Sequence, residues 1–287
     1  MLPPIFGVLF DGLAYGMLLF LLSVGLTVTL GMMNFVNLAH CAFAMLGGFT
    51  TVALTQGLGW PFLATLPAAF IVTAVVSVAF ERVLYRRLYR ATDLDQCLLT
   101  NGIAFVSIAV AAYYFGTTPQ PIEVPDYLRG SFDFMGLNIG NYRLFLVVIG
   151  LLITAVLVAT LEYTSFGARV RAAVDNQRMA RGLGIDVDGT FAVTFALGSG
   201  LAGLGGALAV EIVGLDHWFA FTYLVFVLIV VSVGGLGSII GSFVAAILIG
   251  VTDIAGKYYV PELGAFLIYL VMLAVLMTRP HGLFGKR

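Results

Sequence analysis

The sequence predicts an all-α fold, a polytopic transmembrane helix bundle of eight or nine spans, and three observations carry this prediction. No Asp, Glu, Lys or Arg occurs from Gly12 to Phe80, a stretch about three times the ~20 residues that cross a bilayer. Of the 287 residues, 61% are hydrophobic and 10% are charged, whereas a soluble domain carries about 25% charged residues. The apolar segments are unbroken rather than alternating, which favours helices over a β-barrel.

Nine apolar segments are long enough to act as spans. Segments 35–55 and 219–257 are the least regular, because paired glycines within them would allow a short, broken or re-entrant helix. We therefore expect residues 1–287 to form a single transmembrane domain. The nine segments are 12–31, 35–55, 61–81, 97–115, 143–162, 190–211, 219–239, 241–257 and 263–279.

The distribution of positive charge orients the bundle, because cytoplasmic loops of membrane proteins carry the excess of Lys and Arg. With nine crossings and the N-terminus outside, eleven of the 14 Lys and Arg residues lie on the inner side. The C-terminus is then cytoplasmic, and residues 116–142 form an external loop. The inner residues are Arg82, Arg86, Arg87, Arg90, Arg169, Arg171, Arg178, Arg181, Arg279, Lys286 and Arg287, and the outer ones are Arg129, Arg143 and Lys257.

The most informative polar segment is 163–189, on the inner side between two spans. Thr164 or Ser165 would cap a helix there, good helix formers continue over 168–181, and the glycines that follow would end it. The segment is weakly amphipathic. A solvated connecting loop, anchoring on the membrane surface and docking into a groove of another protein all remain open from the pattern alone.

Four motifs in chain order together resemble one family, the permease subunits of branched-chain amino acid ABC importers, and specifically the H-type partner of an H/M pair. Asn37 and Cys41 depart from the family's usual residues, and both lie in the membrane, so they bear on the substrate more than on the fold. The motifs are Gly25-Leu26-Thr27 with Gly31 to His40, Arg171-Ala172 and Asp175 with Met179 to Ile185 and Phe195, Gly234 to Gly241, and Arg279 to Gly285.

The resemblance implies a set of partners at the bacterial inner membrane: a second permease subunit of the M type that forms a heterodimer with this chain, two cytoplasmic ATPases and a periplasmic substrate-binding protein. ATP and Mg would be used by the ATPases. This chain contains no G-x-x-x-x-G-K-[ST] loop, so it is not expected to be an enzyme or to hold a cofactor. A net charge of −1 argues against a nucleic-acid partner.

In this interpretation segment 163–189 is a cytoplasmic coupling element on which the ATPases pull to alternate access. The resemblance and the charge pattern point to seven residues of this element. They are Arg169, Arg171, Asp175, Met179, Ala180, Leu183 and Gly184.

Few polar residues lie inside the predicted spans, where they are costly and often functional. Asn34, Asn37 and His40 recur every three residues and would share a helix face near the inner end. They would line the pathway, break the helix, or fix packing through interhelical hydrogen bonds. Asp253 is the deepest carboxylate and the other pathway candidate, with an interfacial role as its alternative. No second His or acidic residue lies near His40, so no metal site is expected.

Small residues at four-residue spacing mark close helix packing, because they let two backbones approach in lipid. The pairs singled out are Gly12 with Gly16 and Gly237 with Gly241. Packing within one subunit is the favoured interpretation, and a dimer face is the alternative.

Other functions stay open at this stage. Urea, short amides or aromatic acids are alternative substrates on the same scaffold. An ion-driven secondary transporter is disfavoured by the basic inner segment and by the lack of deep paired acids beyond Asp253. An intramembrane enzyme would need convergent catalytic groups, whereas His40, His217 and His281 are scattered.

Overall fold

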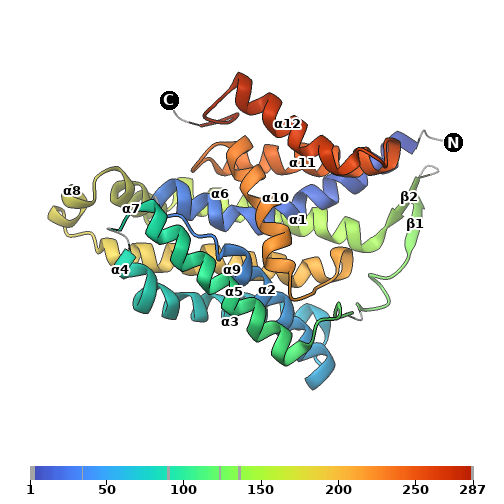
Figure 1. Ribbon diagram of the computed structural model, residues 1–287, viewed down its shortest axis with the longest axis horizontal. Coiled ribbons are helices and arrows are strands. Elements are labelled where there is room, and N and C mark those ends of the chain that lie inside the picture. The colour runs from blue at the N-terminus through green and yellow to red at the C-terminus, as the bar shows by residue number, and fades with distance from the viewer. Residues whose placement is uncertain (1–3, 34, 89–90, 123, 135–136, 286–287) are drawn as a thin grey trace.

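The computed structural model describes residues 4–33, 35–88, 91–122, 124–134 and 137–285, and these residues are mainly helical (Figure 1). Most helices follow one another with short connections, and the long exception is the connection between α5 and α6, residues 116–140. In chain order the elements are α1 (Pro4–Met33), α2 (His40–Val52), the π-helical turn η1 (Ala53–Gly57), α3 (Phe62–Phe80), the π-helical turn η2 (Glu81–Tyr85), α4 (Arg86–Leu88), α5 (Asp93–Phe115), β1 (Ser131–Phe134), β2 (Leu137–Gly140), α6 (Asn141–Tyr163), α7 (Ser165–Asp175), α8 (Gln177–Gly182), α9 (Val187–Val213), α10 (Phe219–Gly234), α11 (Ile239–Tyr259) and α12 (Gly264–Thr278).

The polytopic helical architecture that the sequence predicts is confirmed. Within the described residues, six helices are long and apolar enough to cross a membrane: α1, α3 with its continuation to Leu88, α5, α6, α9 and α11. Helices α10 and α12 are apolar but shorter. The predicted segment 35–55 is not one helix, since α2 begins only at His40. The number of crossings and the orientation stay predictions.

The all-α prediction misses one small sheet. Within residues 116–142, predicted as a loop, β1 and β2 pair antiparallel, with Ser131 opposite Gly140 and Asp133 opposite Asn138. The hairpin lies at the same end of the molecule as the N-terminus (Figure 1). We call this end the hairpin end.

The opposite end carries α4, α7, α8 and the C-terminal residues (Figure 1). Because these segments hold most of the arginines, we call it the arginine-rich end. The grouping agrees with the separation of charge on which the predicted orientation depends.

Side chains cap the helices that begin at the arginine-rich end, where backbone N–H groups would otherwise lack partners. Thr164 is the cap of α7, since its hydroxyl accepts a hydrogen bond from the Gly167 N–H at 3.3 Å. The sequence predicts Thr164 or Ser165 as the cap of this helix, and the structure shows Thr164. The five capping residues are Thr92 for α5, Thr164 for α7, Asn176 for α8, Asp186 for α9 and Ser238 for α11.

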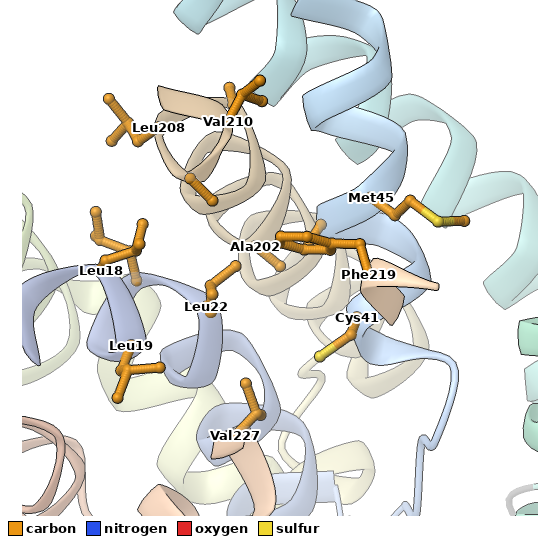
Figure 2. Packing of buried hydrophobic residues seen from close by; sticks show 14 of the residues in the cluster. Leu18, Leu19, Leu22, Cys41, Met45, Ala202, Leu208, Val210, Phe219 and Val227 are labelled. Atoms are coloured by element: carbon orange, nitrogen blue, oxygen red, sulfur yellow. The ribbon is translucent and has the colours of Figure 1, made fainter. Parts of the chain in front are cut away.

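The core lies where α1, α2, α9 and α10 meet. Figure 2 shows Leu22 of α1, Met45 of α2, Ala202 of α9 and Phe219 of α10 in this region, and all four are buried. Helices α1 and α9 are mostly buried, whereas α5 and α6 leave most of their apolar surface exposed. An apolar surface of that kind suits contact with lipid. The two central helices therefore organise the bundle, and α5 and α6 form its outer wall.

Candidate functional site

Segment 163–189 folds as two short helices, α7 and α8, rather than as the single helix predicted over 168–181. The break falls at Asn176, whose backbone is extended and whose side-chain Oδ1 accepts a hydrogen bond from the Met179 N–H at 3.0 Å. An Asn that caps a new helix competes with continuation of the old one. The pair therefore makes a corner at the arginine-rich end, with α8 at its tip (Figure 1).

The tip of α8 presents two large apolar side chains to the surroundings. Met179 is 64% exposed and Leu183 is 79% exposed. They are spaced i, i+4, which places them near each other on one face. A protruding apolar pair next to charged residues is a surface suited to a partner.

Two of the predicted coupling residues contact the rest of the protein instead. The Arg171 guanidinium donates to the backbone carbonyl oxygen of Leu161 in the last turn of α6. Ala180 is 2% exposed and packs in the interior. Ala180 cannot touch a partner directly in this structure, whereas Arg171 remains partly exposed. Both residues anchor α7 and α8 on the bundle.

The other predicted coupling residues lie on the outside. Arg169 and Asp175 are exposed, and the Arg169 Nε donates only to the Ser165 carbonyl oxygen of its own helix, at 3.3 Å. No described ion pair joins Arg171 to Asp175, although they are spaced i, i+4. Gly184 is exposed and has φ +81°, a left-handed conformation that ends the α8 turn.

Asp188, in the first turn of α9, ties the corner to its neighbours. One carboxylate oxygen accepts from Arg86 of α4 at 2.5 Å, and the other accepts from Arg181 of α8 at 2.8 Å. These groups are about half exposed, so each pair contributes little to stability. Their effect is to fix the position of α8 relative to α4 and α9.

An aromatic cluster connects α7 and α8 to the interior. We call Phe35, Phe43, Tyr85 and Phe195 the inner aromatic cluster. The Tyr85 ring centroid lies 5.1 Å from that of Phe35 and 5.3 Å from that of Phe195, and Phe195 lies 5.9 Å from Phe43. Ala173 of α7 and Ala180 of α8 pack into the same buried group. The corner is therefore joined by continuous packing to the chain around α2.

The four family-like motifs meet at one cavity of about 840 Å³ at the arginine-rich end. Gly31 lines it from the first motif, Arg171 and Asp175 from the second, Gly237 from the third and His281 from the fourth. The motifs are distant in sequence, and the fold brings them together at this cavity.

The third and fourth motifs are also joined by hydrogen bonds. The N–H groups of Leu283 and Phe284 donate to the carbonyl oxygens of Val233 and Gly234, at 2.8 and 3.1 Å. These are carbonyls at the C-terminal end of α10, which a helix leaves without internal partners. The C-terminal segment thus caps α10.

The chain before α2 is irregular, and side chains of α5 satisfy part of its backbone. The Val36 N–H donates to Oε1 of Gln96 at 2.9 Å, and the Leu38 N–H donates to Oγ1 of Thr100 at 3.1 Å. Irregular backbone within a membrane protein needs such partners, because no bulk water is available there. The 35–55 segment is therefore a broken helix. Its non-helical part, before α2, is stabilised by these two hydrogen bonds to α5.

Asn37 and His40 sit at this break, so they do not share a helix face as the spacing predicts, and Asn34 lies outside the described residues. Both described residues are buried, at 1% and 0% exposure. Asn37 Oδ1 accepts from the Ala39 N–H at 3.1 Å, and His40 Nε2 lies 3.0 Å from the Leu22 carbonyl oxygen. Within the described part of the chain, Asn37 Nδ2 and His40 Nδ1 have no hydrogen-bond partner.

Asp253 is buried between helices near the hairpin end of α11. Its Oδ2 pairs with Nζ of Lys257 at 2.6 Å, and the Asp253 side chain is 1% exposed. Lys257 Nζ also lies 5.9 Å from the centre of the Tyr15 ring. Asp253 Oδ1 has no hydrogen-bond partner among the described residues. The carboxylate is thus more deeply buried than an interfacial residue.

The glycine pair of α1 lies against α11. A Cβ on Gly12 would lie 2.6 Å from Cα of Val251, and one on Gly16 would lie 2.8 Å from Cα of Ile247. Both positions therefore need the absence of a side chain for the helices to meet this closely. The contact is within one subunit.

The second glycine pair differs, because Gly237 is in a turn and not in a helix. Its φ of +77° is one that other residues rarely adopt, and a Cβ there would lie 3.1 Å from Cα of Gly31. Gly241, in the first turn of α11, faces Gly234, with an added Cβ 2.9 Å from the Gly234 carbonyl carbon. The two residues shape the corner between α10 and α11.

Several residues of the site were not singled out from the sequence. The predicted orientation uses Lys257 only as an outer charge. Its i, i+4 spacing from Asp253 is nevertheless a signal for the ion pair between the two residues. Gln96 and Thr100 are polar residues four apart in an apolar segment, which is a signal for buried hydrogen bonds. Tyr85 carries no comparable signal. Among the described residues no group of three or more His, Cys, Asp or Glu could hold a metal ion.

The fold and the site define a class, a polytopic helical membrane protein with a capped, charged corner at one end and a broken helix inside. The chain belongs to the family described as branched-chain amino acid transport system / permease component, whose model matches residues 8–276. The resemblance drawn from the four motifs is thereby confirmed.

Individual relatives agree over nearly the whole chain. The chain is 27% identical to a probable branched-chain amino acid transport permease protein LivH of Methanocaldococcus jannaschii, over 97% of this chain and 92% of the relative. It is 22% identical to the high-affinity permease protein LivH of Escherichia coli K12, over 97% and 94%. It is 26% identical to the permease protein BraD of Pseudomonas aeruginosa, over 97% and 95%. No solved structure gives a significant match.

Proposed function

We propose that this chain is the permease subunit of an ATP-binding-cassette importer that moves branched-chain or related small amino acids across the bacterial inner membrane. The family and the names of the relatives support the transport role. The single observation that carries the ATP-driven mechanism is the exposed pair Met179 and Leu183 at the tip of α8. This pair offers apolar side chains for a groove on a partner.

In this proposal two cytoplasmic ATPases bind α8 at the arginine-rich end, which faces the cytoplasm, and they use ATP and Mg. The chain itself is not an enzyme. A second, M-type permease subunit completes the pathway as a heterodimer, and a periplasmic binding protein delivers the ligand to the hairpin end. The arginines gathered at the arginine-rich end support this orientation, because cytoplasmic loops carry the excess of positive charge.

Movement of α8 would reach the broken helix through packed side chains. Asp188 links α8 to α9 and α4, Ala180 enters the buried group with the inner aromatic cluster, and Phe35 of that cluster belongs to the irregular chain before α2. We propose that closing of the ATPases shifts this group and alternates access. Packed cores respond to such shifts by switching between discrete arrangements rather than by continuous deformation.

Copurification tests the proposal. The chain is extracted in mild detergent from the membranes of its host, bound proteins are identified, and ATP hydrolysis is measured in liposomes with the binding protein loaded with leucine. We expect two ATPase subunits, a second permease, and hydrolysis stimulated by the loaded binding protein. A chain that purifies alone and moves solute on an ion gradient would contradict the proposal. Stimulation by urea, a short amide or an aromatic acid, but not by leucine, would contradict the substrate class alone.

A further inference from the structure

Helix α2 starts inside the protein and not at its surface. Its first residue, His40, is fully buried, and the His40 imidazole hydrogen-bonds to the Leu22 carbonyl, in the middle part of α1. The irregular chain from Phe35 to Asn37 and the turn at Leu38 and Ala39 lead to this point. The N-terminus of α2 therefore places the positive end of a helix dipole in the interior.

Two buried polar atoms at this helix start lack partners among the described residues: Asn37 Nδ2 and His40 Nδ1. Proteins leave few buried polar groups unpaired. Here two unpaired atoms lie within four residues of one another at the start of α2. The packing of the described residues does not explain them.

The hydrogen bonds that are made fix the chemistry of the two atoms. A carbonyl oxygen only accepts, so His40 Nε2 carries the proton toward Leu22. Nδ1 of the neutral ring is then an acceptor. Asn37 Oδ1 accepts from the Ala39 N–H, so the atom of Asn37 without a partner is the NH₂ donor. The helix start thus offers one donor and one acceptor.

We propose that the N-terminus of α2 recognises the main-chain group of an amino acid as it crosses the membrane. Asn37 Nδ2 donates to the carboxylate, which also gains from the positive end of the α2 dipole. His40 Nδ1 accepts from the ammonium group. A zwitterion has no net charge, and this arrangement meets both of its charges with neutral groups, which avoids a buried fixed charge. The assignment rests on the proposed function and specifies the atoms behind it.

Two substitutions at His40 separate recognition from structure. His40→Gln places an amide where Nε2 lies, so it can keep the bond to Leu22, but it removes the acceptor at Nδ1. His40→Asn places an amide oxygen close to Nδ1, so it keeps the acceptor and gives up the bond to Leu22. The proposal predicts that uptake of leucine falls at least about tenfold in His40→Gln and is retained better in His40→Asn.

A purely structural histidine predicts the reverse order, because the bond to Leu22 is then the one that matters. Equal uptake in the two variants would also overturn the proposal. Uptake is measured in liposomes that hold the assembled complex, with leucine on its binding protein in excess. Assembly and basal ATP hydrolysis are measured in parallel, and only variants that assemble are compared.

Asn37→Asp provides a second test. It keeps the oxygen that caps the Ala39 N–H and replaces the NH₂ donor by an oxygen that repels a carboxylate. We expect an assembled complex whose uptake falls at least about tenfold. Thr51→Val is the matched control, because Thr51 is a buried residue of α2 whose hydroxyl donates to the Gly47 carbonyl oxygen of its own helix. Normal uptake in Asn37→Asp would overturn the proposal.

The wild-type complex separates a failure of the α2 assignment from a failure of the proposed importer function. Wild-type uptake of leucine with unaffected His40→Gln and Asn37→Asp variants would refute the assignment at α2 and leave the importer intact. A wild-type complex that assembles and moves no amino acid would overturn the proposed function and this inference with it.

Discussion

At the scale of single residues, Asp253 and Lys257 form an unequal pair. The Asp253 carboxylate is 1% exposed, while the Lys257 side chain is 56% exposed. If one partner is removed, the outcome depends on where the remaining charge lies, because an uncompensated buried charge is costly. An exposed ammonium can turn to water, whereas the buried carboxylate cannot.

We therefore predict that Lys257→Gln destabilises the protein by about 3 kcal/mol, either through the unpaired carboxylate or through its protonation. Asp253→Asn should assemble normally and stay close to the wild type in thermal stability. Fluorescence-detected gel filtration after heating in detergent measures both. Equal losses of thermal stability in the two variants would contradict the prediction that the buried carboxylate depends on Lys257 more than Lys257 depends on it.

Asp253→Asn also tests the pathway role of this residue. We expect reduced leucine uptake by a normally assembled complex, because a carboxylate oxygen without a partner is available to the transported molecule. Unchanged uptake would leave Asp253 with a structural role only.

Tyr85 combines a well-packed ring, in the inner aromatic cluster, with a buried hydroxyl that lacks a hydrogen-bond partner among the described residues. Burying a hydroxyl without a partner costs free energy. Tyr85→Phe keeps the ring and removes the hydroxyl, so we expect a gain of about 1 kcal/mol in stability.

The same thermal assay measures this gain, with Phe195→Leu as a control that reduces the cluster and should destabilise. A loss of stability or of ATP-coupled uptake in Tyr85→Phe would mean that the hydroxyl has a partner in another state of the transport cycle.

At the scale of elements, α8 is the part that the proposed mechanism depends on most. Met179 and Leu183 are exposed in this chain, so their replacement should not affect folding. We predict that Met179→Glu with Leu183→Glu inserts normally, loses or uncouples the ATPases, and lowers ATP-driven uptake at least about tenfold, because charged groups would have to be buried at the interface.

Gln177→Glu is the matched control, since Gln177 is an exposed residue of the same helix and gains a charge there. Copurification of the ATPases and uptake are the two readouts. Wild-type values for both in the double variant would remove the docking role of α8.

Element by element, the sequence predicts most of this fold because long apolar segments leave little choice in a membrane. The structure has a helix or part of a helix in each of the nine predicted segments, and the irregularity expected in 35–55 is present. The sequence does not predict the break at Asn176, because a local side-chain cap decides there between two helices and one. The small hairpin is missed because its strands are only four residues each.

The candidate site is predicted less completely than the fold. The residue types at α8 and at the start of α2 are recognisable in the sequence, but their directions depend on tertiary packing. Arg171 and Ala180 illustrate this. Both belong to the predicted coupling segment, but Arg171 bonds to the end of α6 and Ala180 is buried. The orphan atoms of Asn37 and His40 exist only because α2 starts within the fold.

At the scale of the whole molecule, the arginine-rich end is connected to the interior by continuous packing. The arginine-rich end carries the exposed apolar pair of α8, the interior contains a broken helix, and packed aromatic residues lie between them. A permease driven by its partners requires all three parts. An ion-driven carrier would not require the first.

The most direct test of ATP-driven import is leucine uptake by the purified complex in liposomes, with its binding protein outside, ATP inside and ionophores that collapse all ion gradients. We predict that uptake requires ATP and is unchanged by the ionophores. Uptake that continues without ATP and stops when the gradients collapse would contradict it.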